Sequence, residues 1–196
     1  MIVPLQGTHL PEVVDLHLGS FPEDFVTGLG RGFLERVFYA WFLIHPAGFG
    51  FVWEEGGRLL GYVVGSLDVR SFYGAMFKRR FLRIVLYGFS SFLRRPWHLG
   101  RFIEVALALR RSGELPYPAD LAYIAVEPEV RGRGIGKRLV QVLLDHVRAS
   151  GVEGCWVKTR KDLEESNRLY RAAGYRSWRE FELKGAHYCI YAIRLQ

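Results

Sequence analysis

The chain has 196 residues, of which 49% are hydrophobic and 15% aromatic, enough to bury a core and within the usual size of one domain. The N-terminus lacks the basic and apolar regions of a secretory signal, and no stretch approaches the roughly 18 apolar residues of a membrane span. A single cytoplasmic domain over residues 1–196 is therefore expected, without an integral membrane segment. Cys155 and Cys189 lie in apolar stretches without a further ligand at metal spacing, which favours packed, reduced thiols and no metal site.

The net charge of +7 is concentrated in one segment. Residues 71–112 contain nine basic side chains and a single acidic one, Glu104, so the remainder of the chain is close to neutral. A basic total often indicates nucleic-acid binding, but no separate recognition element accompanies this charge. Nucleic acid is therefore not expected as a partner.

The first third of the chain predicts two helices followed by a hairpin. Apolar residues recur at helical spacing over 10–18, up to Gly19, and aromatic residues do so over 33–42. Two strand-like stretches, 50–53 and 59–69, flank a Glu-Glu-Gly-Gly turn of hairpin type. Helical spacing then returns twice, interrupted once by a proline-containing break, which predicts a basic, aromatic helical insertion.

After the insertion the pattern predicts a strand, a turn and a helix. An apolar run over 121–126 indicates the strand, and a long amphipathic stretch over 135–149 indicates the helix. Gly151 fits the residue just past the end of that helix, where a left-handed conformation is common.

The C-terminal part predicts a strand, a helix and two further strands. The strand covers 154–159, and Asp162 with Glu165 three residues later resembles a capping box that starts the helix. The last two strands cover 175–183 and 187–193. Taken together, the elements predict an α/β (α+β) fold.

A glycine-rich turn, Arg131-Gly132-Arg133-Gly134-Ile135-Gly136, joins the predicted strand to the long helix. Backbone N–H groups of such a turn converge at the positive end of the helix dipole, which makes an anion site. Arg133, Lys137 and Arg138 could meet further phosphate oxygens. A nucleoside-triphosphate turn would need Gly at 131 and Ser or Thr at 138, and a dinucleotide turn from Gly132 would need Gly at 137, so the spacing excludes both.

These residues resemble the GNAT superfamily of N-acetyltransferases, whose cofactor motif R/Q-x-x-G-x-G/A matches Arg131 to Gly136. The stretch from Ile124 to Glu129 is similar to the fourth strand of that family and its exit, and Asn167-Arg168-Leu169-Tyr170-Arg171-Ala172-Ala173-Gly174-Tyr175 is similar to its second signature. The resemblance covers about residues 121–175. It implies a GNAT-like mixed, mostly antiparallel central sheet of about six or seven strands flanked by helices, with the helical insertion before the fourth strand.

The resemblance also implies acetyl-CoA as the co-substrate and a place for it. Backbone groups of Ile124 and Val126 would pair with the pantetheine arm where the fourth and fifth strands diverge. Asn167 would bind the same arm, and Tyr170 would stand near the sulfur as the acid for the leaving thiolate. The pyrophosphate would be held by the backbone amides of Gly132, Arg133, Gly134, Ile135, Gly136 and Lys137.

Direct attack of an amine on the thioester in a ternary complex requires a base that removes the proton of the amine. A backbone N–H near Val126 would stabilise the oxyanion. The central strand positions hold no carboxylate, and Glu127 is the favoured candidate for the base. The alternatives are Asp120, Glu23, Asp24, His17 and His187.

Two functions remain open for the whole protein. The favoured one is an acetyl-CoA-dependent N-acetyltransferase for a primary amine of a small acceptor, such as an amino sugar or a nucleotide sugar. The rival is a non-catalytic acyl-CoA-binding module with a regulatory or membrane-peripheral role. Likewise the insertion over 71–112 could cap the acceptor site and bind an acidic substrate, lie on an anionic membrane, or pack on the sheet and on a second copy in a homodimer.

Overall fold

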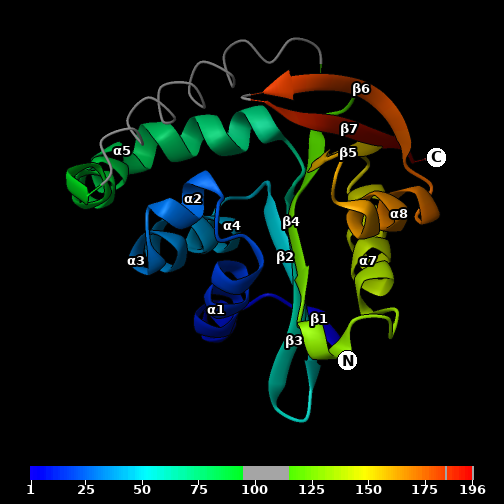
Figure 1. Cartoon of the computed structure of the whole chain (residues 1–196), viewed down its shortest axis with the longest axis horizontal. Coiled ribbons are helices and arrows are strands. Elements are labelled where there is room, and N and C mark those ends of the chain that lie inside the picture. The colour runs from blue at the N-terminus through cyan, green and yellow to red at the C-terminus, as the bar shows by residue number, and fades with distance from the viewer. Residues whose placement is uncertain (95–114, 184, 196) are drawn as a thin grey trace.

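The computed structural model describes residues 1–94, 115–183 and 185–195. Seven strands in these ranges form one sheet in the order β1-β2-β3-β4-β5-β7-β6 (Figure 1). Only β4 and β5 are parallel neighbours within this sheet. The strands are β1 (Ile2–Pro4), β2 (Gly48–Glu55), β3 (Arg58–Ser66), β4 (Ala119–Val126), β5 (Gly154–Arg160), β6 (Arg176–Leu183) and β7 (Ala186–Arg194).

Helices cover both faces of the sheet (Figure 1). One face carries α1 (Leu10–Ser20), α2 (Phe25–Gly28), α3 (Arg31–Phe33), the π-helical turn η2 (Leu34–Tyr39), α4 (Ala40–Ile44) and α5 (Val69–Arg94). The other face carries α7 (Ile135–Ala149) and α8 (Glu164–Ala172). Two short 3₁₀ turns, η1 (Gly7–His9) and η3 (Pro128–Val130), complete the described elements.

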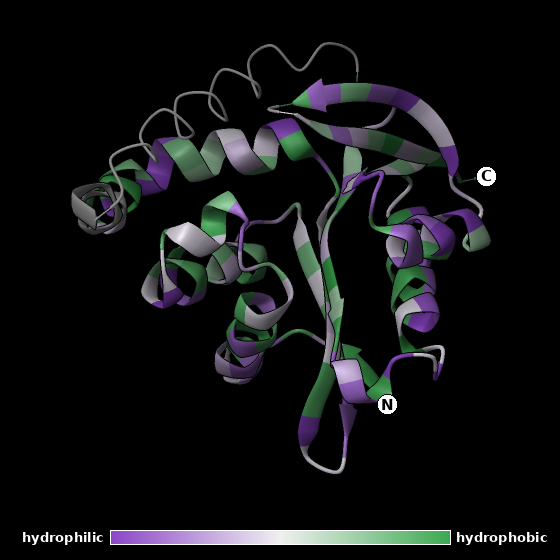
Figure 2. Ribbon diagram, in the orientation of Figure 1, coloured by the Kyte–Doolittle hydropathy of each residue, from purple (hydrophilic) through white to green (hydrophobic). Residues whose placement is uncertain are grey.

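The core consists of two layers, one on each face of the sheet. The layer under α1 to α5 is rich in aromatic residues, and the layer under α7 and α8 is mainly aliphatic. β3 is buried from Leu59 to Ser66 because helices cover both of its faces, and Figure 2 shows apolar residues along the central strands between the two layers. Full burial of one large apolar side chain stabilises the fold by about 1.5–3 kcal/mol, so these two layers dominate its stability.

The π-helical turn η2 lets three consecutive side chains enter the aromatic layer of the core. Val37, Phe38 and Tyr39 are consecutive and each is at most 2% exposed. In a regular α-helix three consecutive side chains spread over about 200°, which is wider than one buried face. The wider turn lets all three reach the core, and it brings Tyr39 into the cluster described below.

The structure confirms the predicted fold class and most predicted elements. The hairpin of β2 and β3 and the helix α7 over 135–149 lie where the sequence indicates, and Gly151 has a φ of 74° just past α7. Helical turns also run through the predicted helix over 33–42. Both cysteines are buried and free, as expected. None of the described helices combines the length and apolar character needed to cross a bilayer.

Two local predictions are wrong, and one strand was missed. The stretch 59–69 does not stay extended, because Asp68 Oδ1 accepts a hydrogen bond from Ser71 N at 3.0 Å and begins α5 at Val69. The capping box of Asp162 and Glu165 does not form, because the Asp162 carboxylate binds the Arg160 guanidinium instead. The short strand β1 was not predicted at all. The second helix predicted for the insertion, beyond residue 100, lies outside the described residues.

Candidate functional site

The parallel pair β4 and β5 opens shortly after it begins. Ala119 pairs with Cys155 and Asp120 with Trp156, and no pairing continues beyond. On its other side β4 remains bonded to β3, and Glu127 N donates to Leu60 O at 2.9 Å. Because backbone groups alternate sides along a strand, those of Ile124 and Val126 point to the open side. This exposed strand edge is the divergence that the sequence resemblance implied.

A β-bulge lies where the two strands separate. Val64 pairs with Tyr123 but Gly65 pairs with Leu121, so Ala122 is an extra residue in β4. A Cβ on Gly65 would lie 2.3 Å from Asp120 O, so only glycine fits opposite the bulge. The Asp120 carboxylate accepts hydrogen bonds from Ser66 N and Oγ at 3.0 and 2.7 Å, and burial raises the pKa of Asp120 to about 6. These bonds give Asp120 a structural role in joining β3 to β4.

The glycine-rich turn leads directly into the N-terminus of α7. Gly132 and Gly134 have φ values of 80° and 79°, and a Cβ added at either would meet no atom within 4 Å. The left-handed conformation favours glycine, and the free space above both residues leaves the backbone open to a ligand. Ile135 is 2% exposed and fixes the start of α7 in the core. The turn therefore fits a pyrophosphate group at a helix N-terminus.

Basic side chains surround this turn, and three of them already have partners. The Arg138 guanidinium lies over the Trp53 ring, 5.5 Å from its centroid. Arg133 Nη2 donates to both carboxylate oxygens of Glu55 at 2.8 and 2.9 Å, and these bonds are the main reason that the pKa of Glu55 is lowered. Arg131 Nε donates to Val126 O at 3.2 Å, on the open edge of β4. Lys137 is exposed and belongs to the first turn of α7.

The two polar residues expected to act from the second signature, Asn167 and Tyr170, lie in different environments. Asn167 Nδ2 donates to the carbonyl oxygens of Arg160, Lys161 and Leu163 at 2.9, 3.3 and 2.6 Å. Its nitrogen is thus occupied in holding the β5–α8 connection, and a bond to a ligand would have to use its carbonyl oxygen. Tyr170 is 5% exposed, and burial raises its pKa above the ordinary value of 10.0, so it remains a neutral donor at physiological pH.

Glu127 lies away from the bulge. It follows β4 and precedes η3, beside the glycine-rich turn, and is four residues beyond Tyr123. Four residues of a strand span about 13 Å, so Glu127 lies well away from the bulge. This position argues against Glu127 as a base for chemistry at the strand divergence.

A polar cluster lies on the α1 face of the sheet, beside the bulge. The Tyr123 hydroxyl donates to Asp24 Oδ2, and Phe25 N donates to Asp24 Oδ1 at 2.6 Å. Burial, and next the Asp24 charge, raise the pKa of Tyr123. The Tyr123 ring packs edge-on against His17, with ring centroids 4.9 Å apart. These two hydrogen bonds fix the Asp24 carboxylate in position. Asp24 is partly exposed, so the carboxylate remains reachable from solvent.

His17 is the centre of the buried part of this cluster. Its Nδ1 lies 2.6 Å from the Tyr39 hydroxyl oxygen, which lies 2.7 Å from that of Tyr62, and its Nε2 lies 2.9 Å from Thr27 Oγ1. Burial lowers the pKa of His17 to about 4, although the Asp24 charge opposes this. The Tyr62 hydroxyl oxygen also lies 3.2 Å from Nδ1. The imidazole is therefore neutral, fully buried and surrounded by three hydroxyl groups.

The sequence named Asp24 and His17 only among alternatives and gave no role to Tyr123. Tyr123 and Asp24 are 99 residues apart, so no local motif could join them. Two further alternatives do not join this pair. Glu23 is next to Asp24 in the chain but exposed, with its Oε2 4.0 Å from Arg160 Nη1. The His187 carbonyl oxygen accepts a hydrogen bond from Lys161 N. No group of three potential metal ligands occurs among the described residues.

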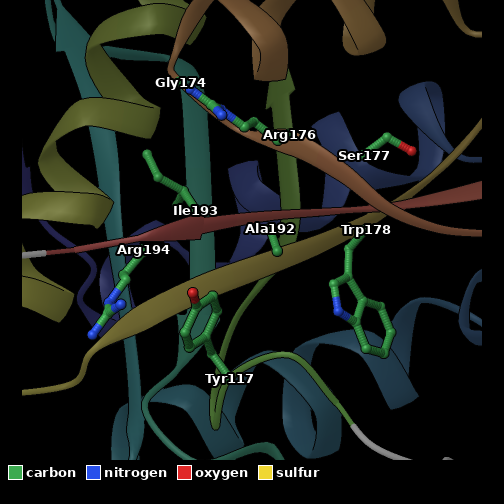
Figure 3. A pocket seen from close by; sticks show the side chains of 8 residues that line it. All are labelled: Tyr117, Gly174, Arg176, Ser177, Trp178, Ala192, Ile193 and Arg194. Carbon is green, nitrogen blue, oxygen red and sulfur yellow. The ribbon is translucent and has the colours of Figure 1, made fainter.

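A separate pocket lies where β6 begins and β7 ends (Figure 3). The Tyr117 ring and the Trp178 ring lie on the same side of the strands as Ala192. Its lining consists of Tyr117, Gly174, Arg176, Ser177, Trp178, Ala192, Ile193 and Arg194. None of the predicted site residues lines it, so this pocket is distinct from the glycine-rich turn.

The chain is similar to known proteins in sequence and in fold. The family model described as the acetyltransferase (GNAT) family matches residues 10–175. The N-alpha-acetyltransferase RimI of Mycobacterium tuberculosis is 36% identical over 76 residues, which are 39% of this chain and 46% of that protein. An uncharacterized protein of Mycobacterium leprae is 37% identical over 60 residues, or 31% of this chain and 16% of that protein. The chain thus spans less than half of the length of these two relatives.

Solved structures share the fold over nearly their whole length. A ribosomal-protein-alanine N-acetyltransferase from Brucella melitensis aligns with a TM-score of 0.65 and 16% identity, covering 100% of this chain and 99% of that one. A putative acetyltransferase from Salmonella typhimurium, solved with acetyl-CoA, aligns with a TM-score of 0.64 and 15% identity, covering 100% and 94%. Since the family model spans more than half of the residues, the chain belongs to the acetyltransferase (GNAT) family.

Proposed function

We propose that this protein transfers an acetyl group from acetyl-CoA to an amine. The observation that carries the proposal is the continuity of the open β4 edge with the glycine-rich turn at the N-terminus of α7. An extended strand edge suits an amide-containing arm, and the turn suits a pyrophosphate. When bound, acetyl-CoA would supply the activated thioester.

The roles of the chain's own residues follow from their positions. Backbone groups of Ile124 and Val126 would bind the pantetheine arm, and the amides from Gly132 to Lys137 would bind phosphate oxygens. Arg133 would exchange its bonds to Glu55 for a phosphate, and Arg131 would release Val126 O. Asn167 would contribute its carbonyl oxygen only.

Two tyrosines would act on opposite sides of the reacting centre. Tyr170 would remain protonated because burial raises its pKa, and it would donate that proton to the leaving thiolate. Tyr123 would act as a positioning residue, since its hydroxyl holds the Asp24 carboxylate. Asp24, in place of Glu127, would accept a hydrogen bond from the attacking amine and guide its proton to solvent.

The acceptor proposed is the α-amino group of a protein or peptide, in preference to an amino sugar. The relative from M. tuberculosis and the structure from B. melitensis are named for acetylation of such groups. An α-amino group has a pKa of about 7.7–8.0 and a lysine side chain about 10.4, so the former is partly neutral at physiological pH. A single partly exposed carboxylate suffices to accept its proton, which supports this choice.

Two measurements test the proposal. Titration calorimetry with acetyl-CoA should give saturable binding, and coenzyme A release should follow with a peptide that begins with a free alanine. The same peptide with an acetylated N-terminus and an internal lysine is the matched control, and glucosamine tests the sugar alternative. Faster release with glucosamine would contradict the peptide acceptor.

The Tyr170→Phe variant separates the enzyme from a non-catalytic acyl-CoA-binding module. General-acid catalysis contributes about 10²-fold, so kcat should fall by that factor while the Kd for acetyl-CoA stays constant. Saturable binding by the wild-type protein without turnover of any peptide, amino sugar or nucleotide sugar would favour the binding module instead.

A further inference from the structure

The outward face of α5 carries apolar side chains that remain exposed among the described residues. Phe81, Leu82 and Leu86 are 59%, 68% and 63% exposed, and Val85 is 38% exposed. The opposite face of the helix packs into the core through Phe72, Met76 and Ile84, each at most 5% exposed. Since successive residues turn by about 100°, the four exposed residues form one stripe, which we call the α5 patch (Phe81, Leu82, Val85 and Leu86).

Basic side chains border the α5 patch, and acidic ones are missing from this part of the helix. Residues 69–87 contain five Lys or Arg residues and no Asp or Glu. Arg79 and Arg83 are four residues apart and lie on the edge of the patch, next to Leu82 and Leu86. Arg80 differs because its guanidinium lies over the Trp41 ring, 5.6 Å from the centroid.

A hollow beside the α5 patch adds a second observation. Arg36 of η2 and Arg83 of α5 line it together with Leu86 and Tyr87. Two guanidinium groups next to apolar carbon suit a phosphate that is attached to a lipid, because guanidinium binds phosphate oxygens while the neighbouring side chains contact hydrocarbon. No acidic residue is among the described residues that line this hollow.

We propose that the α5 patch, with Arg36, Arg79 and Arg83, binds the surface of an anionic phospholipid membrane. The apolar side chains would enter the boundary between headgroups and acyl chains, and the arginines would meet lipid phosphates. The helix would lie on the surface, consistent with the finding that no described helix is apolar enough to span a bilayer. This inference does not depend on the proposed acetyl transfer.

A second copy of the chain fits the α5 patch less well. A two-fold symmetric contact brings each residue of a patch toward the same patch on the partner. Arg79 and Arg83 would then face a surface that is also basic and has no carboxylate to pair with. An anionic surface supplies the missing charge, and the symmetric contact does not.

Vesicle flotation with the full chain tests the inference. Wild-type protein should bind vesicles of phosphatidylcholine with phosphatidylglycerol at least about 10-fold more than vesicles of phosphatidylcholine alone, and high salt should reduce the difference. Leu82→Glu should lower binding to the anionic vesicles by about 10-fold or more, because it removes an apolar contact and adds a repelled charge. Arg36→Gln combined with Arg83→Gln should lower it as well.

Leu163→Glu is the matched control, because Leu163 is 47% exposed and directly precedes α8. Figure 1 shows α8 on the other face of the sheet from α5. This control variant should bind as the wild type does, and circular dichroism should show that all variants are folded. Absence of wild-type binding to anionic vesicles, or an equal loss in Leu163→Glu, would overturn the inference. So would a dimer in sedimentation without lipid that Leu82→Glu dissociates, since the patch would then be a contact between copies.

Discussion

The two faces of the sheet differ in the kind of group that each offers to a ligand. On the α7 face the proposed binding groups belong to the backbone: the open edge of β4 and the amides of a turn with two left-handed glycines. On the α1 face they are side chains from separate elements, with Asp24, Tyr123 and His17 joined by hydrogen bonds and ring contacts. Backbone recognition tolerates many side chains, whereas the α1 face depends on each residue that forms it. Substitutions should therefore affect the two faces differently.

The largest effect is expected on the α7 face from Gly134→Glu. A side chain at φ 79° costs about 1–2 kcal/mol, and a carboxylate would stand where a phosphate approaches. Calorimetry should show acetyl-CoA affinity reduced by about 10³-fold or more. Gly151→Glu is the matched control, because Gly151 has a similar φ of 74° past the far end of α7 and should leave affinity unchanged. Equal affinity in the Gly134 variant would remove the turn from the site.

Asp24→Asn should produce the next largest effect, and only on the acceptor side. We expect kcat/KM for the amine to fall by about 100-fold while the Kd for acetyl-CoA stays constant, because the carboxylate that accepts the amine is lost. Tyr123→Phe should act in the same direction more weakly. Glu23→Gln removes the neighbouring exposed carboxylate and should leave the rate unchanged; an equal loss there would indicate a general charge effect.

Two buried groups, His17 and Asp120, should change the free energy of unfolding in opposite directions between pH 7 and pH 5. The folded state holds His17 at a pKa of about 4 against 6.5 when unfolded, so acidification to pH 5 costs about 2 kcal/mol. The pKa of Asp120 is raised to about 6 in the folded state from 3.8, so the same acidification stabilises the fold by about 1 kcal/mol.

Urea unfolding at both pH values measures this balance. The wild-type free energy of unfolding should change little, His17→Gln should gain stability at pH 5 relative to pH 7, and Asp120→Asn should lose it. Each variant is compared with itself at the other pH, which separates titration from the loss of packing. Parallel pH profiles for all three proteins would contradict the assignment.

The smallest effect is expected from Glu55→Gln. Because Arg133 is bound by Glu55, the substitution should free its guanidinium for a phosphate and raise acetyl-CoA affinity by about two- to fivefold. Calorimetry at low and high salt should show the gain mainly at low salt. Weaker binding would mean that Glu55 positions Arg133 for the ligand.

The same contrast explains what the sequence could predict. The glycine-rich turn lies between one strand and one helix, so its residues are adjacent in the chain and their spacing carries the signal. The pair of Tyr123 and Asp24 spans 99 residues and exists only after β4 packs against the helices of the other face. β1 is three residues long and includes Pro4, too short for a periodic pattern. The sequence offered Glu127 as a base only because the central strand positions hold no carboxylate, and the distance along β4 separates it from the bulge.

The extra residue Ala122 determines which side chains of β4 face each of the two helical layers. Before it, Ala119 and Leu121 face the α7 layer, so odd-numbered residues point there; after it, Ile124 and Val126 do, so even-numbered residues point there. Tyr123 reaches the α1 layer only because of this change of parity. If β4 ran through Ala122 with ordinary alternation and no bulge, Tyr123 would face α7 and Ile124 would face α1. One inserted residue in β4 therefore sets which side chains are available on each face of the sheet.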